Sequence, residues 1–458
     1  MDSVPQIDLG EILERRPIGR FQLVTLALGV LALFVNGLDY SATNVAAPAV
    51  LRAFHAGRGA MGPVFGWSFF GIFLGSILLG IAGDRWGRKT GLIIAVLAYS
   101  VPALLTGFAH SLGELSLYRF LAGLGIGGAV PNTIALLTET APKRYRVTFV
   151  MAAFVGYSTG NAGIAQVAAW LIPGFGWQVV FVVAGGMGLL LTILLAFTLS
   201  ESLPFLAATK PQSMALRQLA KRAIPEVVIP ANARFVSRES DGTGFSLKLL
   251  FSSYRRIATP LLWIAFFAES LTFMTYSAWL AVILEQSGLT PRVAALTFSY
   301  GAFAAVVAIL FFGRLIDRFG PRTTVVPALL TVASILVLAS GNLQPLPLAA
   351  MAVIAMGCAA ATHQSLNGIV GGFYPTIIRG NGVGYATGMG RMSAILGPIV
   401  VGWLMAANTP LQQTLWAIAA PELVVAAAAI GLDFVRRSPS AAADFAIPFP
   451  QSTGEQPI

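Results

Sequence analysis

The sequence predicts an all-α membrane protein with twelve transmembrane helices in two pseudo-symmetric halves of six. Three observations support this fold class. Of the 458 residues, 56% are hydrophobic and only 10% are charged, too few to cover a soluble protein of this length. The apolar runs are about 20 residues long, which suits spanning helices, and they lack the strict alternation of barrel strands. Finally, the two sets of runs share an internal repeat.

The apolar runs form two sets of six with a long polar segment between them. The first set covers residues 21–46, 63–83, 90–110, 113–138, 149–172 and 177–199. The second set covers residues 259–285, 293–313, 323–341, 346–371, 380–405 and 412–435. We therefore expect helical halves at 21–199 and 259–435, a cytoplasmic linker at 200–258, and cytoplasmic ends at 1–20 and 436–458.

The basic residues predict the orientation of the chain. Of the 29 Lys and Arg residues, 24 lie in the two ends or in every second loop, which by the positive-inside rule places both termini in the cytoplasm. The formal net charge of +10 therefore reflects topology, and no basic stripe interleaved with aromatic residues suggests nucleic-acid binding. The first span lacks a cleavage-like site and should stay in a bacterial inner membrane.

The internal repeat is visible in two short segments that follow the second and eighth spans. These are Gly83–Arg88 and Ile316–Arg322, which both contain an Asp-Arg pair and a glycine. One offset of 233 residues relates Asp84 to Asp317, Pro142 to Pro375, and Arg146 to Arg379. Because several pairs share one offset, we infer a parallel duplication about an axis along the membrane normal.

The segments GDRWGRK and IDRFGPR, with RFLAGLGIGG in the fourth span and ETAPKRYR after it, resemble the major facilitator superfamily. The resemblance covers nearly the whole chain and implies the major facilitator fold. Asp84 can lie near a helix terminus, while the arginines of its loop can reach carboxylates and carbonyl ends of neighbouring helices. We therefore expect a gating function for Asp84, Arg85, Arg88, Glu139, Arg146, Asp317, Arg318 and Arg379.

Longer segments resemble the aromatic acid:proton symporters within that superfamily. They are NGLDY in the first span, GGAVPNTIALLTETAPKR in the fourth, YSAWLAVILEQSG in the seventh, and QSLNGIVGGFYPTIIRGNGVGYATGMGRMSAILGP through the tenth and eleventh. Members of this family carry benzoate-type acids, protocatechuate or vanillate inward with protons. Asn36 stands where the family's first span usually carries an aspartate, which affects the expected proton stoichiometry.

Two ionisable residues in the first half are candidates for proton coupling. Asp39 and Arg119 lie at similar depth on the first and fourth spans, so we expect them to pair when Asp39 is ionised. Protonation of Asp39 would release Arg119 and could bias two conformations. The alternative is a fixed structural ion pair that never titrates.

Charged residues of the second half supply further candidates. Arg391 lies near the centre of the eleventh span, where its planar fork suits a substrate carboxylate. It could instead be a structural cation paired with Glu269. We expect Glu269, in the seventh span, to be a second protonation site or the partner of Arg391. Arg379 is an alternative anchor, although its repeat partner Arg146 favours an inner-gate function.

The tenth span adds polar side chains that could bind ring hydroxyls or a carboxylate. Gln364 and Asn367 match polar positions of the family pattern, and His363 is either a third ligand or a hydrogen bonder between helices. Weaker substrate-binding candidates are Asn36, Asn44, Tyr40, Asn132, Tyr157 and Trp279, whose aromatic members could stack on a ring.

No metal or other cofactor is predicted, because the three histidines are scattered and the single cysteine, Cys358, fits a small buried hydrophobe. No nucleophile and base, nor any metal arrangement, suggests an enzyme. We expect a monomer in membrane lipid whose partners are a small aromatic carboxylate and protons. The alternatives are transport of another organic anion, drug export, or a sensor that does not transport.

Overall fold

The computed structural model describes residues 6–8, 18–209, 213–223, 234–236, 247–341, 343–374 and 376–437. Within them, twelve helices are long and apolar enough to cross a membrane, and each overlaps one predicted span. The first six are α2 (Arg20–Ala53), α3 (Met61–Trp86), α4 (Arg88–Thr106), α5 (Leu112–Thr140), α6 (Arg146–Phe175) and α7 (Gln178–Thr198). The second six are α10 (Arg255–Gln286), α11 (Pro291–Phe319), α12 (Val325–Ala339), α13 (Pro345–Val370), α14 (Thr376–Ala406) and α15 (Leu411–Arg436). The predicted all-α, twelve-helix fold is confirmed.

The remaining elements are short. The 3-10 turns are η1 (Arg58–Ala60), η2 (Lys143–Tyr145), η3 (Leu247–Phe251), η4 (Pro321–Thr324) and η5 (Gly371–Phe373). The region predicted as a linker contains α8 (Leu203–Thr209) and α9 (Met214–Ala223). It also contains β2 (Arg234–Val236), which pairs in parallel with β1 (Gln6–Asp8). The rest of that linker, most of 1–20 and the tail after 437 lie outside the described residues.

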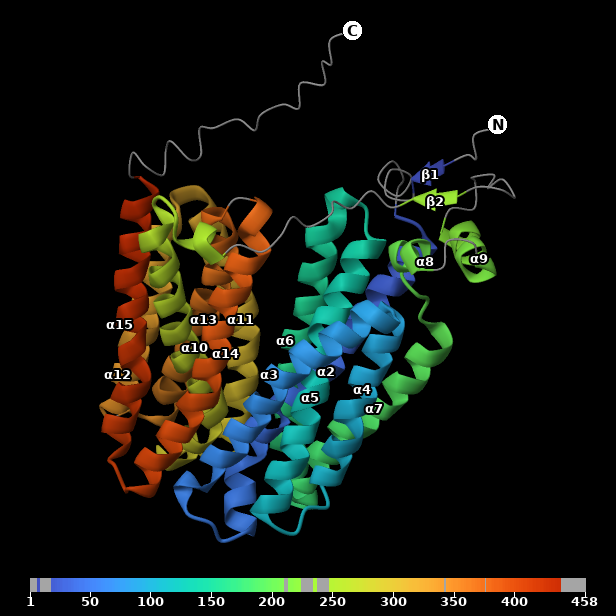
Figure 1. Ribbon diagram of the computed structural model, residues 1–458. Helices are drawn as coiled ribbons and strands as arrows, with labels where there is room; N and C mark the ends of the chain where they lie inside the picture. Colours follow the sequence, from blue (N-terminus) through green and yellow to red (C-terminus); the bar gives the residue numbers. More distant parts are fainter. Residues whose placement is uncertain are drawn as a thin grey trace, which may run out of the picture.

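The twelve helices form two groups that follow the order of the chain. In the first group α5 packs on α3 and α4, α2 packs on α6, and α4 packs on α7. In the second group α11 packs on α13, while α15 packs on α10 and α12. Figure 1 shows the two groups side by side, with α2–α7 on the right and α10–α15 on the left. Contacts between the groups come mainly from α6 with α11, α3 with α14, and α2 with α10.

Glycine residues let neighbouring helices of one group approach each other closely. A Cβ added to Gly75 of α3 would lie 1.9 Å from the carbonyl oxygen of Leu124, so only glycine allows α3 and α5 to meet there. Large apolar side chains such as Leu190, Phe197 and Val307 are instead exposed on the outside, with relative accessibilities of 69%, 85% and 68%. Such a surface suits lipid, and the chain is a multi-pass membrane protein.

The internal repeat is visible in the backbone as well as in the sequence. Gly87 and Gly320 occupy equivalent positions and both have a positive φ, of 102° and 86°, which allows the sharp turn after α3 and after α11. Two pairs of equivalent residues also contact each other, Asn44 with Ser277 and Arg52 with Glu285, each 233 positions apart. Equivalent residues can touch only near the symmetry axis, so the axis passes between α2 and α10.

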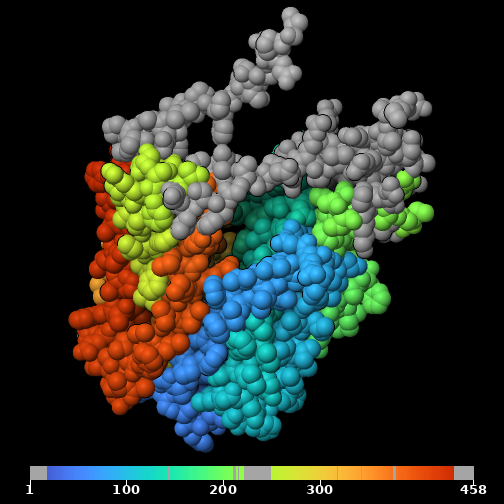
Figure 2. All heavy atoms as spheres, in the orientation of Figure 1, coloured from blue at the N-terminus to red at the C-terminus, as the bar shows by residue number. Residues whose placement is uncertain are grey.

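The two ends of the bundle differ in how the halves meet. We call the end where α2 begins and α15 ends the termini side, and the opposite end the far side. At the far side, a Cβ on Gly59 of η1 would lie 2.2 Å from the carbonyl oxygen of Gly402 in α14. Arg292 at the start of α11 stacks on Trp170 near the end of α6, with 3.6 Å between the guanidinium carbon and the ring centroid. In Figure 2 the blue residues of α3 adjoin the orange residues of α14 across the boundary.

Candidate functional site

Asp39 and Arg119 form an ion pair inside the first half. Nη1 of Arg119 donates to Oδ1 of Asp39 at 3.0 Å, and the two side chains are only 0% and 1% exposed. Arg119 also donates from Nε to the Thr106 hydroxyl at 3.2 Å and lies over the ring of Phe181. The pair that similar depth on α2 and α5 predicted is therefore present, while its part in proton coupling stays a prediction.

This ion pair is neutral as a unit but is not fully hydrogen-bonded. Among the described residues, Oδ2 of Asp39 and Nη2 of Arg119 have no hydrogen-bond partner. Removing one member of a buried pair leaves an uncompensated charge, which typically costs about 3–5 kcal/mol. A proton on Asp39 would have that consequence for Arg119, so protonation must be accompanied by a new arrangement around the arginine.

Two further candidates in the first span, Asn36 and Tyr40, point in different directions. Asn36 is fully buried and donates to the backbone oxygen of Ile126 in α5 at 3.3 Å, within the first half. Tyr40 instead crosses the boundary, because its hydroxyl donates to the sulfur of Met274 in α10 at 3.1 Å. Its ring also lies 5.7 Å from that of Tyr157. Of the two residues, only Tyr40 reaches the other half.

In the second half, Glu269 is paired with His363 and not with Arg391. Nδ1 of His363 lies 2.5 Å from Oε2 of Glu269, which links α13 to α10. The imidazole stacks on Phe273 and its side chain is 22% exposed, whereas Glu269 is 0% exposed. His363 is thus a hydrogen bonder between helices, as one of the two interpretations proposed. The alternative pairing of Arg391 with Glu269 is not formed.

Arg391 lies in α14 at the boundary between the halves. Its Nη1 donates to the hydroxyl of Ser76 in α3 at 2.5 Å, and the side chain is exposed. Among the described residues, no carboxylate lies within ion-pair distance of it. This guanidinium therefore retains the capacity to bind an anion, whereas that of Arg119 is occupied by Asp39.

The polar residues of α13 share one partly exposed face. Gln364 and His363 are adjacent, and Asn367 follows one turn later, where its amide donates to the backbone oxygen of His363 at 3.0 Å. Trp279 does not join this face. It is fully buried, donates from Nε1 to the backbone oxygen of Pro398 at 3.2 Å, and lies edge-on to Phe65. It belongs to the packing between the halves, so the structure does not bring it together with Gln364.

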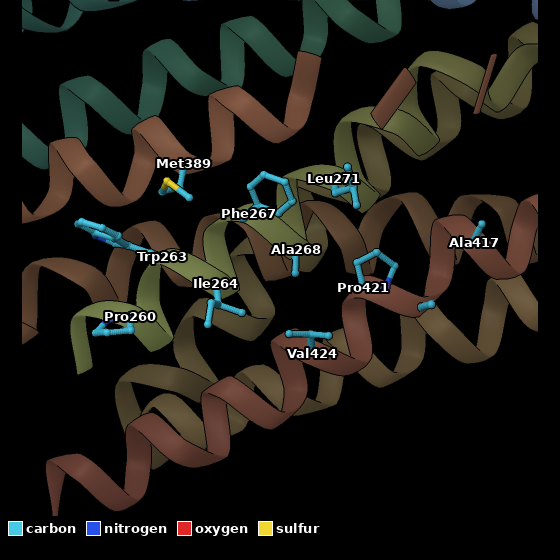
Figure 3. Close-up of a pocket in the computed structure, with 11 residues that line it drawn as sticks. Pro260, Trp263, Ile264, Phe267, Ala268, Leu271, Met389, Ala417, Pro421 and Val424 are labelled. Carbon is cyan, nitrogen blue, oxygen red and sulfur yellow. The ribbon is translucent and has the colours of Figure 1, made fainter. Parts of the chain in front are cut away.

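A separate pocket of about 570 Å³ lies among α10, α14 and α15 (Figure 3). Its lining is formed by Pro260, Trp263, Ile264, Phe267, Ala268, Leu271, Met389, Ala417, Ala420, Pro421 and Val424. None of these side chains is charged, and Ile264 and Val424 are exposed on the outer surface. The pocket therefore suits a lipid chain and lacks the groups to bind a carboxylate.

The loop after α3 contains a charged network on the termini side. Arg88 pairs with Asp84 one turn earlier and also donates from Nε to Oε1 of Glu139 at 2.9 Å. Glu139, near the end of α5, accepts a further hydrogen bond from the hydroxyl of Ser202. Glu201 accepts from the backbone nitrogen of Lys89 at 3.0 Å. The network thus connects α3, α4, α5 and the segment after α7.

The equivalent loop of the second half does not repeat two members of this network. By the repeat, Pro321 stands in place of Arg88, and Gly372 stands in place of Glu139. The side chain of Asp317 lies outside the described residues.

The remaining gating candidates are at the termini side. Arg318 stacks on Phe319, and Arg379 donates from Nε to the backbone oxygen of Tyr374 at 3.3 Å. Arg85 is exposed, and Arg146 begins α6.

Two features of the structure were not anticipated from the sequence. Glu422 of α15 is fully buried and close enough to Glu269 for their charges to interact. It could have been found from the cost of a carboxylate in the middle of the last span. The ion pair of Arg52 with Glu285 could have been found from the 233-residue offset, which makes the two positions equivalent.

Comparison with known proteins places these features in a family. The model of the Major Facilitator Superfamily matches residues 29–308 and 262–455. The chain is 30% identical to a 4-hydroxybenzoate transporter of Acinetobacter baylyi over 430 residues, 93% of each protein. It is 32% identical to a gallate transporter of Pseudomonas putida, over 95% of this chain and 98% of the relative. A 3-(3-hydroxy-phenyl)propionate transporter of Escherichia coli is 30% identical over 91% of this chain and 95% of the relative.

Solved structures agree on the fold. A bacterial homologue of the human lysosomal transporter Spinster, in an inward-facing and occupied conformation, superposes with a TM-score of 0.70 at 17% identity. The match covers 92% of this chain and all of that one. The xylose transporter of Escherichia coli, in a partially occluded inward open conformation, gives 0.69 at 15% identity, over 89% and 97% of the two chains. The chain is a membrane transporter and not an enzyme, and it belongs to the Major Facilitator Superfamily, in the family that contains these aromatic acid transporters.

Proposed function

We propose that the chain imports an aromatic carboxylate together with at least one proton, by alternating access between its two halves. The observation that carries this proposal is Arg391, a guanidinium near mid-helix in α14 that faces the boundary and has no carboxylate partner among the described residues. A charged side chain at that depth in the membrane is costly, and its presence there indicates a functional role. The transporters of 4-hydroxybenzoate, gallate and benzoate among its relatives favour a ring-bearing acid as the anion.

Other candidate side chains of the two halves suit such an acid. A bidentate guanidinium can hold the carboxylate, and the amides of Gln364 and Asn367 can accept or donate hydrogen bonds to ring hydroxyls. Tyr40 and Tyr157 form an aromatic pair at the boundary. They offer a stacking surface that an aliphatic acid would not use.

Proton coupling has an electrostatic reason. An anion that enters against an inside-negative potential costs about 2.3 kcal/mol per charge per 100 mV, and one accompanying proton cancels that cost. Asp39 and Arg119 are the coupling pair in this proposal. A proton on Asp39 breaks the ion pair, and Arg119 then needs a new partner, which favours a different packing of α2 and α5.

The orientation that the basic residues favour assigns the two ends of the bundle to the two sides of the membrane. With both termini in the cytoplasm, the termini side opens inward and the far side faces the periplasm. The contacts of Gly59, Arg52 and Arg292 then close the periplasmic side, as expected of an inward-facing state. One chain contains both halves and the path between them, so the proposed working unit is a monomer.

Uptake into proteoliposomes tests the proposal. Labelled benzoate, 4-hydroxybenzoate, vanillate and gallate are offered with and without an inward proton gradient, beside an aliphatic diacid and a sugar acid as controls. We expect accumulation of at least one aromatic acid that requires the gradient and is abolished by a protonophore. Accumulation of only the control acids would show that the substrate is not an aromatic acid. Binding of an acid without its uptake would indicate a sensor.

A further inference from the structure

The second half contains a buried carboxyl group that the proposed function does not use. Glu422 is 0% exposed in α15, and neither of its carboxyl oxygens has a hydrogen-bond partner among the described residues. A negative charge on Glu422 would interact unfavourably with that of Glu269 in α10, whose Oε1 also lacks a partner among the described residues. The hydroxyl of Thr272 donates to the backbone oxygen of Ile418 at 2.8 Å and holds the two helices together beside these carboxyls.

Three ionisable groups determine the charge at this place. His363 of α13 is paired with Glu269, and the neutral thiol of Cys358 on the same helix lies within electrostatic range of Glu422. The helix α12 also packs on α15, but it has no titratable side chain. In α14, Arg391 is directed to Ser76 of the other half. We call His363, Glu269 and Glu422 the carboxyl–imidazole cluster.

The cluster is neutral only when it holds two protons. With none, the two carboxylates give a charge of −2, each proton adds one unit, and a third proton makes the cluster positive. A net charge in the membrane interior is costly, so the two-proton form is favoured. Glu269 can be ionised because His363 compensates it, whereas ionised Glu422 would have no donor. The two protons therefore belong on His363 and Glu422.

The ion pair of the first half has the opposite requirement. Arg119 is permanently charged, so its pair with Asp39 is neutral without any bound proton. The two halves thus balance their buried charges in different ways, although they arose from one repeat. By the 233-residue offset, Thr272 replaces Asp39, Ala352 replaces Arg119, and Glu269 replaces Asn36.

A route for proton exchange is given by the order of burial. His363 is 22% exposed on the partly exposed face of α13, and Glu269, which it contacts, is 0% exposed. A proton from the boundary between the halves can therefore reach Glu269 through His363, which is hydrogen-bonded to it. Glu422 is also 0% exposed, and among the described residues no hydrogen bond joins it to Glu269.

We propose that His363, Glu269 and Glu422 form a second proton-binding site, separate from Asp39 and Arg119, and that Glu422 holds one of its protons. The inference deepens the proposed function and rests on it for one consequence. An anion bound near His363 and a third proton on the cluster neutralise each other, so each strengthens the binding of the other. Through this reciprocal effect, the second half would couple the binding of an anion to the binding of a proton.

Infrared spectroscopy of the purified protein in lipid, without substrate, tests the site. A protonated carboxyl group has a carbonyl stretching band that an ionised carboxylate lacks. We expect this band at neutral pH in the wild type and its loss in Glu422→Gln, which preserves the size of the protonated side chain. The matched controls Asp39→Asn and Glu285→Gln remove carboxylates that are paired with arginines, so the band should stay.

The proposal is overturned if Glu422→Gln keeps the protonated band and loses carboxylate absorption instead. If that variant does not fold, the unaltered protein is treated with a hydrophobic carbodiimide, which reacts with protonated carboxyls in apolar surroundings. Mass spectrometry should then find the adduct on Glu422, and an adduct elsewhere with none on Glu422 overturns the proposal. Neither readout needs a substrate, so a failure of this inference is distinguishable from a failure of aromatic acid transport.

Discussion

Arg52 and Glu285 occupy equivalent positions of the two repeats and form an ion pair with each other on the pseudo-symmetry axis. Because the two equivalent positions carry opposite charges, the residues attract each other and hold the two halves together. The pair closes the far side beside a cavity of about 380 Å³ that both halves line. Any state that opens the far side must separate this pair.

Reversing one charge of this pair should therefore open the far side. Such a partly exposed pair contributes about 0.2–1 kcal/mol, and two like charges there would shift the equilibrium by roughly a few-fold. We expect Arg52→Glu to raise the labelling rate of Ala169→Cys, a residue of that cavity, by a membrane-impermeant maleimide in a Cys358→Ser background. Adding Glu285→Arg should restore the slow rate, and Arg58→Glu, an exposed charge on the same side, should have no effect. Equal labelling in all variants would refute the closing function.

The charged network around Arg88 should control the rate of conformational exchange. Asp84→Asn removes one of its two acidic partners at the termini side, and Asp317→Asn alters the equivalent loop. We expect either change to slow exchange by about three- to tenfold, in the range of one charge-assisted hydrogen bond, with substrate affinity within about twofold of wild type. Stopped-flow fluorescence and equilibrium binding separate the two effects. Loss of binding with normal exchange would assign these residues to the substrate site.

Arg391→Lys should weaken substrate binding more than proton coupling. Lysine keeps the charge but loses the planar fork, and the lost hydrogen bond is worth about 1–2 kcal/mol, a roughly tenfold increase in the apparent KM. The dependence of uptake on the proton gradient should remain. As a control, Arg379→Lys changes an arginine that contacts the backbone of Tyr374 and should leave KM nearly unchanged. The anchor assignment fails if the KM of Arg391→Lys equals that of the wild type.

The orientation can be tested without any substrate. An epitope tag at either terminus or within 205–250 should be reachable only after the membrane is permeabilised, because the positive-inside rule predicts that the basic loops face the cytoplasm. Antibody labelling of intact spheroplasts measures this, and a tag after Ala56, in the loop before η1, is the positive control. Labelling of a terminal tag in intact spheroplasts would overturn the proposed orientation.

The parts of the fold that could be predicted depend on local physics. Long apolar runs determine the spans, so hydropathy predicts all twelve helices, and the depth of Asp39 and Arg119 along α2 and α5 is enough to predict their contact. Rotation about a helix axis is set by packing, which no single span reveals. The sequence therefore could not show that Asn36 faces α5, that Trp279 packs against Phe65, or that Glu269 selects His363 over Arg391.

The second carboxyl of the cluster is a different case. Glu422 is as unusual in its span as Glu269 is in its own, and the cost of a buried carboxylate applies to both equally. The internal repeat gives no signal for it, because the equivalent residue of the first half is Leu189. Only the packing of α10 on α15 shows that the two carboxyls belong to one group.

The most direct test compares wild type with Asp39→Asn in proteoliposomes loaded with one aromatic acid. Asparagine mimics the protonated carboxyl and cannot titrate, so the variant should lose accumulation driven by a proton gradient but keep exchange of internal for external substrate. The wild type should do both. If Asp39→Asn still concentrates the acid against its gradient with an unchanged pH dependence, Asp39 is not the coupling carboxylate and the central claim is contradicted.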